Sequence, residues 1–266
     1  MIRRPGRRYW CAVLTGSAIA AAAGCAPSRV ELPSGAGTPF PEATTAYQEA
    51  VHECRNARTI EVTLGLSGRA GSVRLRGNVD AGFEAPDKVR LEGRAPIGRP
   101  VFILAAPGAE ATLYLPRENR VLRNARASEV VEALVGLPLD GAELRALVSG
   151  CGFGAEEPSE GRSFGGQWVV VDTGNAKTYL REHDGRWRLI AAARAGLTVY
   201  YEGFVAGRAS MLRLEAPDSN ADVTARLSDM NINVSLQPAV FDVDVPAAAE
   251  PLTLEELRRA GPLGGQ

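Results

Sequence analysis

The sequence predicts a mainly β fold with helices (α+β), built on a large curved antiparallel sheet. Runs of alternating apolar and polar residues recur between residues 60 and 236, as expected for half-buried strands. Turn signals such as Pro107-Gly108 and Asp184-Gly185 separate these runs. Helical periodicity is confined to the start, the middle and the end of the chain. A sheet of about ten antiparallel strands usually curls or closes to protect its edges.

The N-terminal residues predict a secretory signal that ends at a lipid-modified cysteine. Residues 3–8 carry four arginines and residues 10–23 are uncharged, a stretch too short for a membrane span of about 20 residues. The small residues before Cys25 are similar to the lipobox of bacterial lipoproteins, in which the cysteine becomes the acylated N-terminus. We therefore expect residues 1–24 to be a signal peptide. The alternative is cleavage by an ordinary signal peptidase, which leaves Cys25 as an unmodified thiol.

The charge and the length of the mature chain limit its possible partners and its domain organisation. Residues 25–266 keep 26 basic and 31 acidic side chains, a net charge of −5, which disfavours nucleic acid as a partner because phosphate binding needs a concentrated basic surface. The covalent acyl and diacylglycerol groups on Cys25 are the expected membrane anchor, and no other cofactor is expected. Residues 25–40 are rich in Gly and Pro and predict a flexible tether before a single domain, residues 41–266.

Two cysteines remain in the mature chain, Cys54 and Cys151. An even pair in an oxidising periplasm indicates a disulfide bond. The alternative is two buried free thiols, each packing as a small apolar group. The sequence alone leaves both open.

The helical segments can be placed by their periodicity and their capping residues. Residues 43–54 repeat apolar side chains on one helical face. Ser128 can cap a helix that runs to residue 135. A capping box, Asp140 with Glu143, predicts another helix over residues 140–149, and a second box, Thr253 with Glu256, predicts a short C-terminal helix.

The strands are predicted from period-two alternation. A change of phase near Ser228-Asp229 indicates a bulge or turn there. The predicted strands cover residues 60–66, 73–79, 83–93, 100–106, 110–115, 119–123, 163–172, 176–183, 186–194, 197–205, 209–215, 221–228, 230–236 and 241–245.

This element order resembles the LolA/LolB-like superfamily of lipoprotein carriers and outer-membrane lipoprotein receptors. The likeness rests on four segments: RTIEVTLGLSGRAGSVRLRG, RLEGRAPIGRPVFIL, LPLDGAELRALVSG and FDVDVP. The resemblance implies a curved antiparallel unclosed β-barrel (half-barrel) with a helical lid and an apolar cavity for acyl chains. It also implies that Ile97, between Pro96 and Gly98, matches the exposed apolar residue by which the receptor passes its cargo to the membrane.

Within this resemblance, five leucines are candidates for the cavity and lid: Leu134, Leu137, Leu139, Leu144 and Leu147. Plain core packing is the alternative for all five. For Ile97 the alternative is a side chain folded back onto the core.

Catalysis has little support in the sequence. Motifs of the G-x-S-x-G, H-E-x-x-H and C-x-x-C types are absent, and neither His52 nor His183 has a plausible nucleophile beside it in sequence. No metal-ligand spacing recurs. We therefore expect a protein that is not an enzyme.

The function predicted from these observations is acyl-chain binding and transfer of lipids or lipid-modified proteins. A soluble periplasmic carrier and membrane lipid are the expected partners, and a monomer is the expected state. Ala26, next to the lipidated cysteine, favours the periplasmic face of the outer membrane over retention at the inner membrane. The alternative is an assembly lipoprotein that uses the same fold as a scaffold, with side chains filling the cavity.

Overall fold

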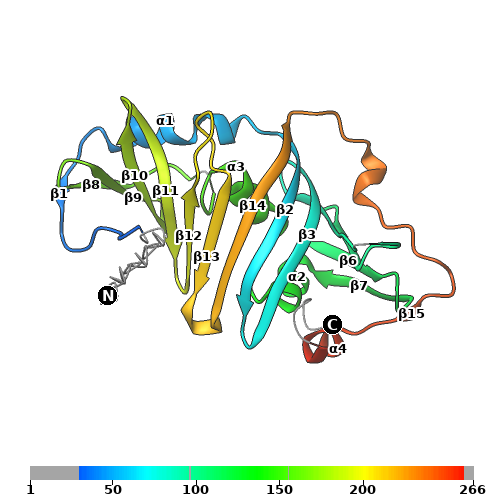
Figure 1. The fold of residues 1–266 in the computed structure, drawn as a ribbon. Coiled ribbons are helices and arrows are strands. Elements are labelled where there is room, and N and C mark those ends of the chain that lie inside the picture. Colours follow the sequence, from blue (N-terminus) through cyan, green and yellow to red (C-terminus); the bar gives the residue numbers. More distant parts are fainter. Residues whose placement is uncertain (1–29, 96, 155, 261–266) are drawn as a thin grey trace, which may run out of the picture. The chain divides into compact units, whose positions relative to one another are not determined.

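The computed structural model describes residues 30–95, 97–154 and 156–260, and the chain from Pro33 onward forms one compact unit. In this described part, fifteen strands form a single open sheet, β1-β8-β9-β10-β11-β12-β13-β14-β2-β3-β4-β5-β6-β7-β15 (Figure 1). All neighbouring strands pair antiparallel except β15 with β7. The predicted mainly β fold, a curved and unclosed barrel with helices, is confirmed.

The strands follow the chain in two series. The first is β1 (Thr38–Pro39), β2 (Thr59–Ala70), β3 (Val73–Glu84), β4 (Lys88–Gly93), β5 (Phe102–Ala106), β6 (Glu110–Leu115) and β7 (Arg120–Arg126). The second is β8 (Glu160–Phe164), β9 (Trp168–Asp172), β10 (Ala176–His183), β11 (Arg186–Arg194), β12 (Leu197–Glu202), β13 (Met211–Ala216), β14 (Ala221–Ile232) and β15 (Glu250–Pro251).

Helices supply the second layer. They are α1 (Ala43–Arg55), α2 (Ala127–Val135), α3 (Gly141–Ser149) and α4 (Leu254–Ala260), with two short 3-10 helices, η1 (Pro217–Ser219) and η2 (Pro238–Phe241). Helix α1 packs on β8–β11, α3 on β3 and β4, and α2 on β6, β7 and α4. In Figure 1, α2 and α3 lie behind the central strands. The inward side chains of the sheet and the apolar faces of the helices form one continuous core.

The predicted capping is confirmed for helix α3 and wrong for helix α2. Asp140 accepts a hydrogen bond from the Glu143 N–H at 2.8 Å, and the Glu143 carboxylate accepts one from the Asp140 N–H, so the predicted capping box begins α3. Helix α2 begins at Ala127, with Arg126 at the N-cap, so Ser128 lies inside the helix and does not cap it.

Several strand boundaries differ from the sequence prediction. Residues 83–93 are not one strand, because a turn at residues 85–87 separates β3 from β4. Residues 163–172 form a hairpin about Gly165 and Gly166, both of which have positive φ. The phase change near Asp229 is a bulge within one strand, β14, where the pairing with β2 shifts between Ser228 and Asn231.

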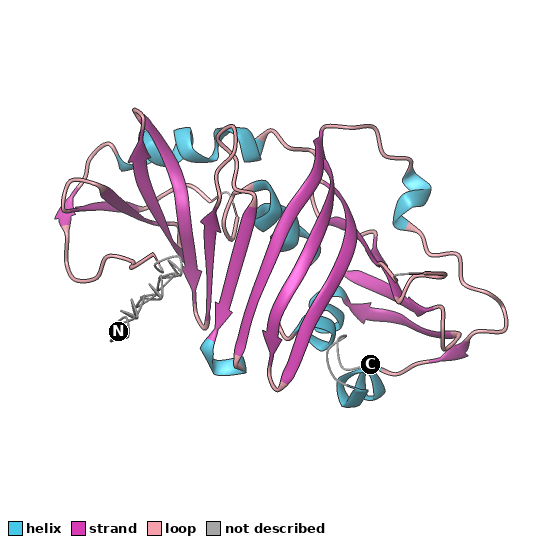
Figure 2. Ribbon diagram, in the orientation of Figure 1, coloured by secondary structure: helices cyan, strands magenta, loops and turns pink. Residues whose placement is uncertain are grey.

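The predicted last strand, residues 241–245, is wrong. Phe241 ends the 3-10 helix η2 and is buried against Lys88, whose ammonium lies 5.5 Å from the ring centroid. The Arg90 guanidinium donates hydrogen bonds of 3.0 Å to the carbonyls of Val240 and Asp242, which hold this segment beside β4. Figure 2 shows that the segment is part of a long connection between β14 and β15, and that this connection contains one short helix.

The predicted tether, residues 25–40, also ends earlier than expected. Thr38 and Pro39 form β1 and pair with Ser163 and Arg162 of β8. The Phe40 ring packs edge-on against Trp187 at 6.0 Å. Residues 38–40 therefore belong to the folded unit.

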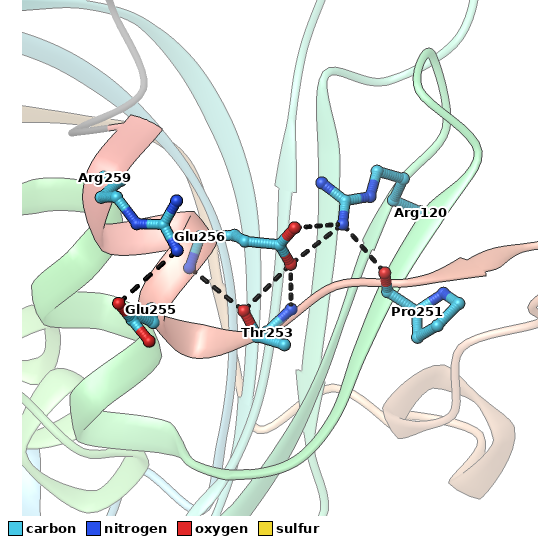
Figure 3. Close-up of polar contacts among 6 residues, drawn as sticks. All are labelled: Arg120, Pro251, Thr253, Glu255, Glu256 and Arg259. Atoms are coloured by element: carbon cyan, nitrogen blue, oxygen red, sulfur yellow. Dashed lines mark hydrogen bonds and ion pairs between the residues drawn. The ribbon is translucent and has the colours of Figure 1, made fainter.

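The C-terminal helix is fixed by a network around Glu256 (Figure 3). Its carboxylate accepts hydrogen bonds of 2.9 Å from the N–H and the hydroxyl of Thr253, and it accepts two of 3.0 Å from the Arg120 guanidinium on β7. These contacts confirm the predicted Thr253–Glu256 capping box. The Thr253 N–H first, and the Arg120 guanidinium next, lower the pKa of Glu256 to about 2.

This low pKa predicts an acid-dependent loss of stability. The carboxyl titrates at 4.5 when unperturbed, so its contribution is present above that pH and is lost as the pH falls towards about 2. Urea unfolding measures the free energy of unfolding of the native chain and of Glu256→Gln. The difference between the two values should shrink as the pH falls from about 6 to about 3. Glu255→Gln, which removes only the exposed ion pair with Arg259, is the control. A difference that stays constant across this range contradicts the assignment.

Candidate functional site

An open groove of about 940 Å³ lies between α1 and the neighbouring ends of two hairpins, β10–β11 and β12–β13. Helix α1 forms one wall because it is amphipathic: Tyr47 and Val51 are buried against the sheet, and Glu49 and His52 remain exposed beside the groove. The apolar residues of the floor and walls are Ala50, Cys54, Val148, Trp187, Leu189, Tyr201, Phe204, Ala206, Ala209, Leu212 and Met230.

Tyr201, on the floor of the groove, has no free polar group to offer a ligand. The Tyr201 hydroxyl donates to the Leu147 carbonyl at 3.2 Å and accepts from the Gly152 N–H at 3.1 Å. Burial raises the pKa of Tyr201, which keeps the phenol neutral. The hydroxyl is thus occupied, and the buried Tyr201 ring adds apolar character to the floor.

A disulfide bond lies beside the groove, which Cys54 borders. The structure joins Cys54, in the last turn of α1, to Cys151, two residues after α3, with their Cα atoms 5.6 Å apart. The Cys151 N–H also donates to the Ala146 carbonyl at 2.8 Å. The bond therefore holds α1 against the end of α3 and removes both thiols from the site.

The rim of the groove is charged. Arg208 on the β12–β13 hairpin forms an ion pair of 3.1 Å with Glu53 on α1, which links the two walls. The Arg188 guanidinium lies 5.5 Å from the centroid of the Phe204 ring and borders the groove on the sheet side. The groove thus combines an apolar floor with a charged mouth, the arrangement of a site for an amphipathic molecule.

The predicted cavity leucines lie elsewhere. Leu134, Leu137, Leu139 and Leu147 are each 2% exposed and pack in the continuous core beneath α2 and α3. Leu144 is half-buried against the same core. The residues that border the groove include none of the five.

The loop between β4 and β5 presents Ile97 to solvent. Its side chain is 90% exposed, and the next residue, Gly98, has φ +88°, a conformation that favours glycine. The alternative in which Ile97 folds onto the core is therefore wrong. Two other predicted site residues, Pro96 and Cys25, lie outside the described residues.

The described ranges bring no metal-binding cluster together. They contain no group of three or more His, Cys, Asp or Glu side chains placed to hold a metal ion. His52 and His183 are both exposed, and the His183 ring contacts Asp184 at 3.3 Å. No described helix combines the length and the apolar character needed to cross a membrane.

The groove itself was not predicted from the sequence. Its walls come from residues 45–54, 148–150, 184–189 and 201–212, with Met230 beside them. The local sequence pattern of each segment is typical of an ordinary amphipathic helix or of the end of a strand. The one available signal was the apolar pair Trp187 and Phe204 beside hairpin turns, where polar residues are usual.

Comparison with known proteins gives a fold. No protein-family model matches the chain, and no curated protein sequence matches it. A LolA-superfamily protein of Nitrosomonas europaea is similar in structure, with a TM-score of 0.52 and 13% identity over 76% of this chain and 97% of that one.

Two more solved structures are similar at lower scores. A DUF1329-family protein of Desulfovibrio piger has a TM-score of 0.48 and 13% identity over 76% of this chain and 98% of its own. A putative outer-membrane lipoprotein-sorting domain of Vibrio parahaemolyticus has a TM-score of 0.45 and 14% identity over 75% of this chain and 97% of its own. With the open, helix-covered sheet described above, the Nitrosomonas comparison shows that this chain has the LolA/LolB-like fold.

Proposed function

We propose that this protein binds the acyl chains of lipids or lipid-modified proteins in the groove beside α1 and takes part in their transfer at the outer membrane. The observation that carries the proposal is the open groove with an apolar floor in a LolA/LolB-like fold. Its volume of about 940 Å³ lies within the range of about 300–1,000 Å³ that is typical of small-molecule sites.

The proposal includes a lipid anchor on Cys25 that holds the folded unit on the periplasmic face of the outer membrane. A soluble carrier delivers the cargo, and the groove accepts its acyl chains without forming a covalent bond. Binding must be moderate, because cargo held too tightly is not released to the membrane. The leucines beneath α2 and α3 form the inner surface that longer chains reach when these two helices move as a lid.

A substitution that fills the groove should abolish acyl binding. Ala209 borders the groove and is half-buried, so Ala209→Trp places a large ring in the space for the ligand. We expect affinity for a fluorescent palmitoylated peptide, measured by anisotropy, to fall at least about tenfold, or about 1.4 kcal/mol. Ala195→Trp, in the exposed β11–β12 turn, is the matched control. Equal affinities for the two variants contradict binding in this groove.

Ile97 should act in delivery and not in binding. Burying one exposed Ile side chain in lipid contributes about 2 kcal/mol, enough for docking but not for anchoring. For Ile97→Glu we expect unchanged affinity for the palmitoylated peptide and transfer to phospholipid vesicles slower by about tenfold or more. Val205→Glu, at the other strongly exposed apolar tip, is the control. Equal slowing by both variants argues against a specific role for the Ile97 loop.

The packing beneath α2 and α3 favours a second candidate function. Leu134, Leu137, Leu139 and Leu147 fill the space that a carrier of this fold needs for cargo, each being 2% exposed. A filled interior suits a scaffold or assembly lipoprotein of an envelope complex. A purified protein that contains no lipid and refuses acylated peptide at high concentration would favour this candidate.

A further inference from the structure

The two walls of the groove carry unpaired charges of opposite sign. Glu49 on α1 is exposed beside the groove, and its side chain forms no hydrogen bond or ion pair with any described residue. Arg186 borders the groove from β11, and its guanidinium is equally without a hydrogen-bond or ion-pair partner in the described part of the chain. Arg188 adds a second guanidinium on the sheet side, where its contact is the Phe204 ring.

The remaining charges at the rim are already engaged. Glu53 and Arg208 pair with each other at 3.1 Å, and Asp184 contacts His183 at 3.3 Å. The helix side therefore offers a free carboxylate and the sheet side offers two guanidinium groups beside the Asp184 carboxylate, with an apolar floor between the two sides. Guanidinium groups recognise phosphate, and a carboxylate accepts hydrogen bonds from a primary ammonium group.

From this charge arrangement we infer that the groove selects a phospholipid with a zwitterionic headgroup, in which phosphate and a primary ammonium are joined by a short linker. The phosphate binds Arg186 and Arg188, the ammonium binds Glu49, and an acyl chain lies over Tyr201 and Leu212. An anionic headgroup without an ammonium leaves Glu49 unpaired. A triacylated cysteine has no phosphate for the arginines. This inference rests on the proposed acyl binding and narrows its ligand class.

The test uses residues 26–266, which contain the whole compact unit, exported by a cleavable signal and purified without detergent. The protein is incubated with mixed vesicles of equal phosphatidylethanolamine, phosphatidylglycerol and phosphatidylcholine with identical acyl chains, then separated from the vesicles and extracted. Bound lipids are quantified by mass spectrometry. The phosphate is common to all three lipids, so the single ion pair between the primary ammonium and Glu49 at the exposed rim sets the selectivity. It predicts up to about fivefold enrichment of phosphatidylethanolamine over the other two lipids.

Two variants and their controls locate the selectivity. Glu49→Gln should remove the enrichment over phosphatidylglycerol while total lipid loading is kept, because only the ammonium site is lost. Arg186→Gln should lower the retention of all three phospholipids by about twofold. Glu61→Gln and Arg123→Gln, exposed positions away from the groove, should leave both quantities unchanged.

The outcomes separate this inference from the proposed function. Equal uptake of the three lipids, or enrichment that survives Glu49→Gln, overturns the headgroup inference and leaves acyl binding standing. Displacement of bound phospholipid by a triacylated lipopeptide at equal concentration overturns it as well. The absence of any bound lipid, with no uptake of palmitoylated peptide, overturns both.

Discussion

Replacing both Cys54 and Cys151 with alanine is expected to lower the free energy of unfolding by about 4 kcal/mol. The disulfide joins residues that are 97 positions apart, and closing a loop of about 100 residues restricts the unfolded chain strongly in the chain-entropy description. In the folded chain the bond also ties the last turn of α1 to the end of α3. Urea unfolding of the double variant and the native chain measures the loss.

The native chain unfolded in the presence of reductant is the control for this result. It should match the double variant, because both lack the same covalent link, and each single variant should match them too. Acyl binding should weaken alongside stability, since the disulfide holds α1, one wall of the groove, against the end of α3. A double variant that stays within about 1 kcal/mol of the native chain contradicts the structural role given to the bond.

Leu147→Ala is expected to cost about 3 kcal/mol, the second large effect. The side chain is 2% exposed in the continuous core, and truncating a buried leucine loses transfer free energy and leaves a cavity. Leu144 lies on the same helix but is half-buried, so Leu144→Ala should cost about 1 kcal/mol. Both changes are Leu→Ala within α3, so helix propensity cancels between them. Chemical unfolding of the two variants gives the comparison.

This pair of variants also tests how the lid leucines are used. If α3 stays packed in solution, Leu147→Ala has the larger effect on stability and the presence of acyl ligand changes neither value greatly. Equal costs near 1 kcal/mol would show that Leu147 is not packed as described, and would favour an interior that opens without ligand.

Local patterns in the sequence predicted several features of the fold. The capping boxes at Asp140 and Thr253 were predicted because the two residues of each box lie three positions apart in the chain. The bulge near Asp229 was visible as a change of alternation phase. The strand predicted over residues 241–245 is absent. Alternation alone cannot tell a strand from an extended segment that side chains hold in place, here through hydrogen bonds from Arg90.

The candidate site could be predicted only in part. The count of two cysteines in the mature chain indicated a bond between Cys54 and Cys151 but left two free thiols as an alternative, and the structure shows the bond. The exposure of Ile97 was implied by the resemblance alone, since its place between Pro and Gly also allowed a side chain folded back onto the core. The groove could not be predicted, because segments more than 100 residues apart, from α1 to β13, meet to form it. Long-range pairing of this kind leaves no mark in the local pattern of any one segment.

The most direct test of acyl binding is the lipid content of the protein itself. Residues 26–266, exported by a cleavable signal and purified without detergent, are analysed intact by native mass spectrometry and then after organic extraction. The account predicts bound acyl lipid in the purified chain or after exposure to vesicles, and its loss in Ala209→Trp but not in Ala195→Trp. A chain that stays free of lipid under both conditions, and that refuses palmitoylated peptide, contradicts the account.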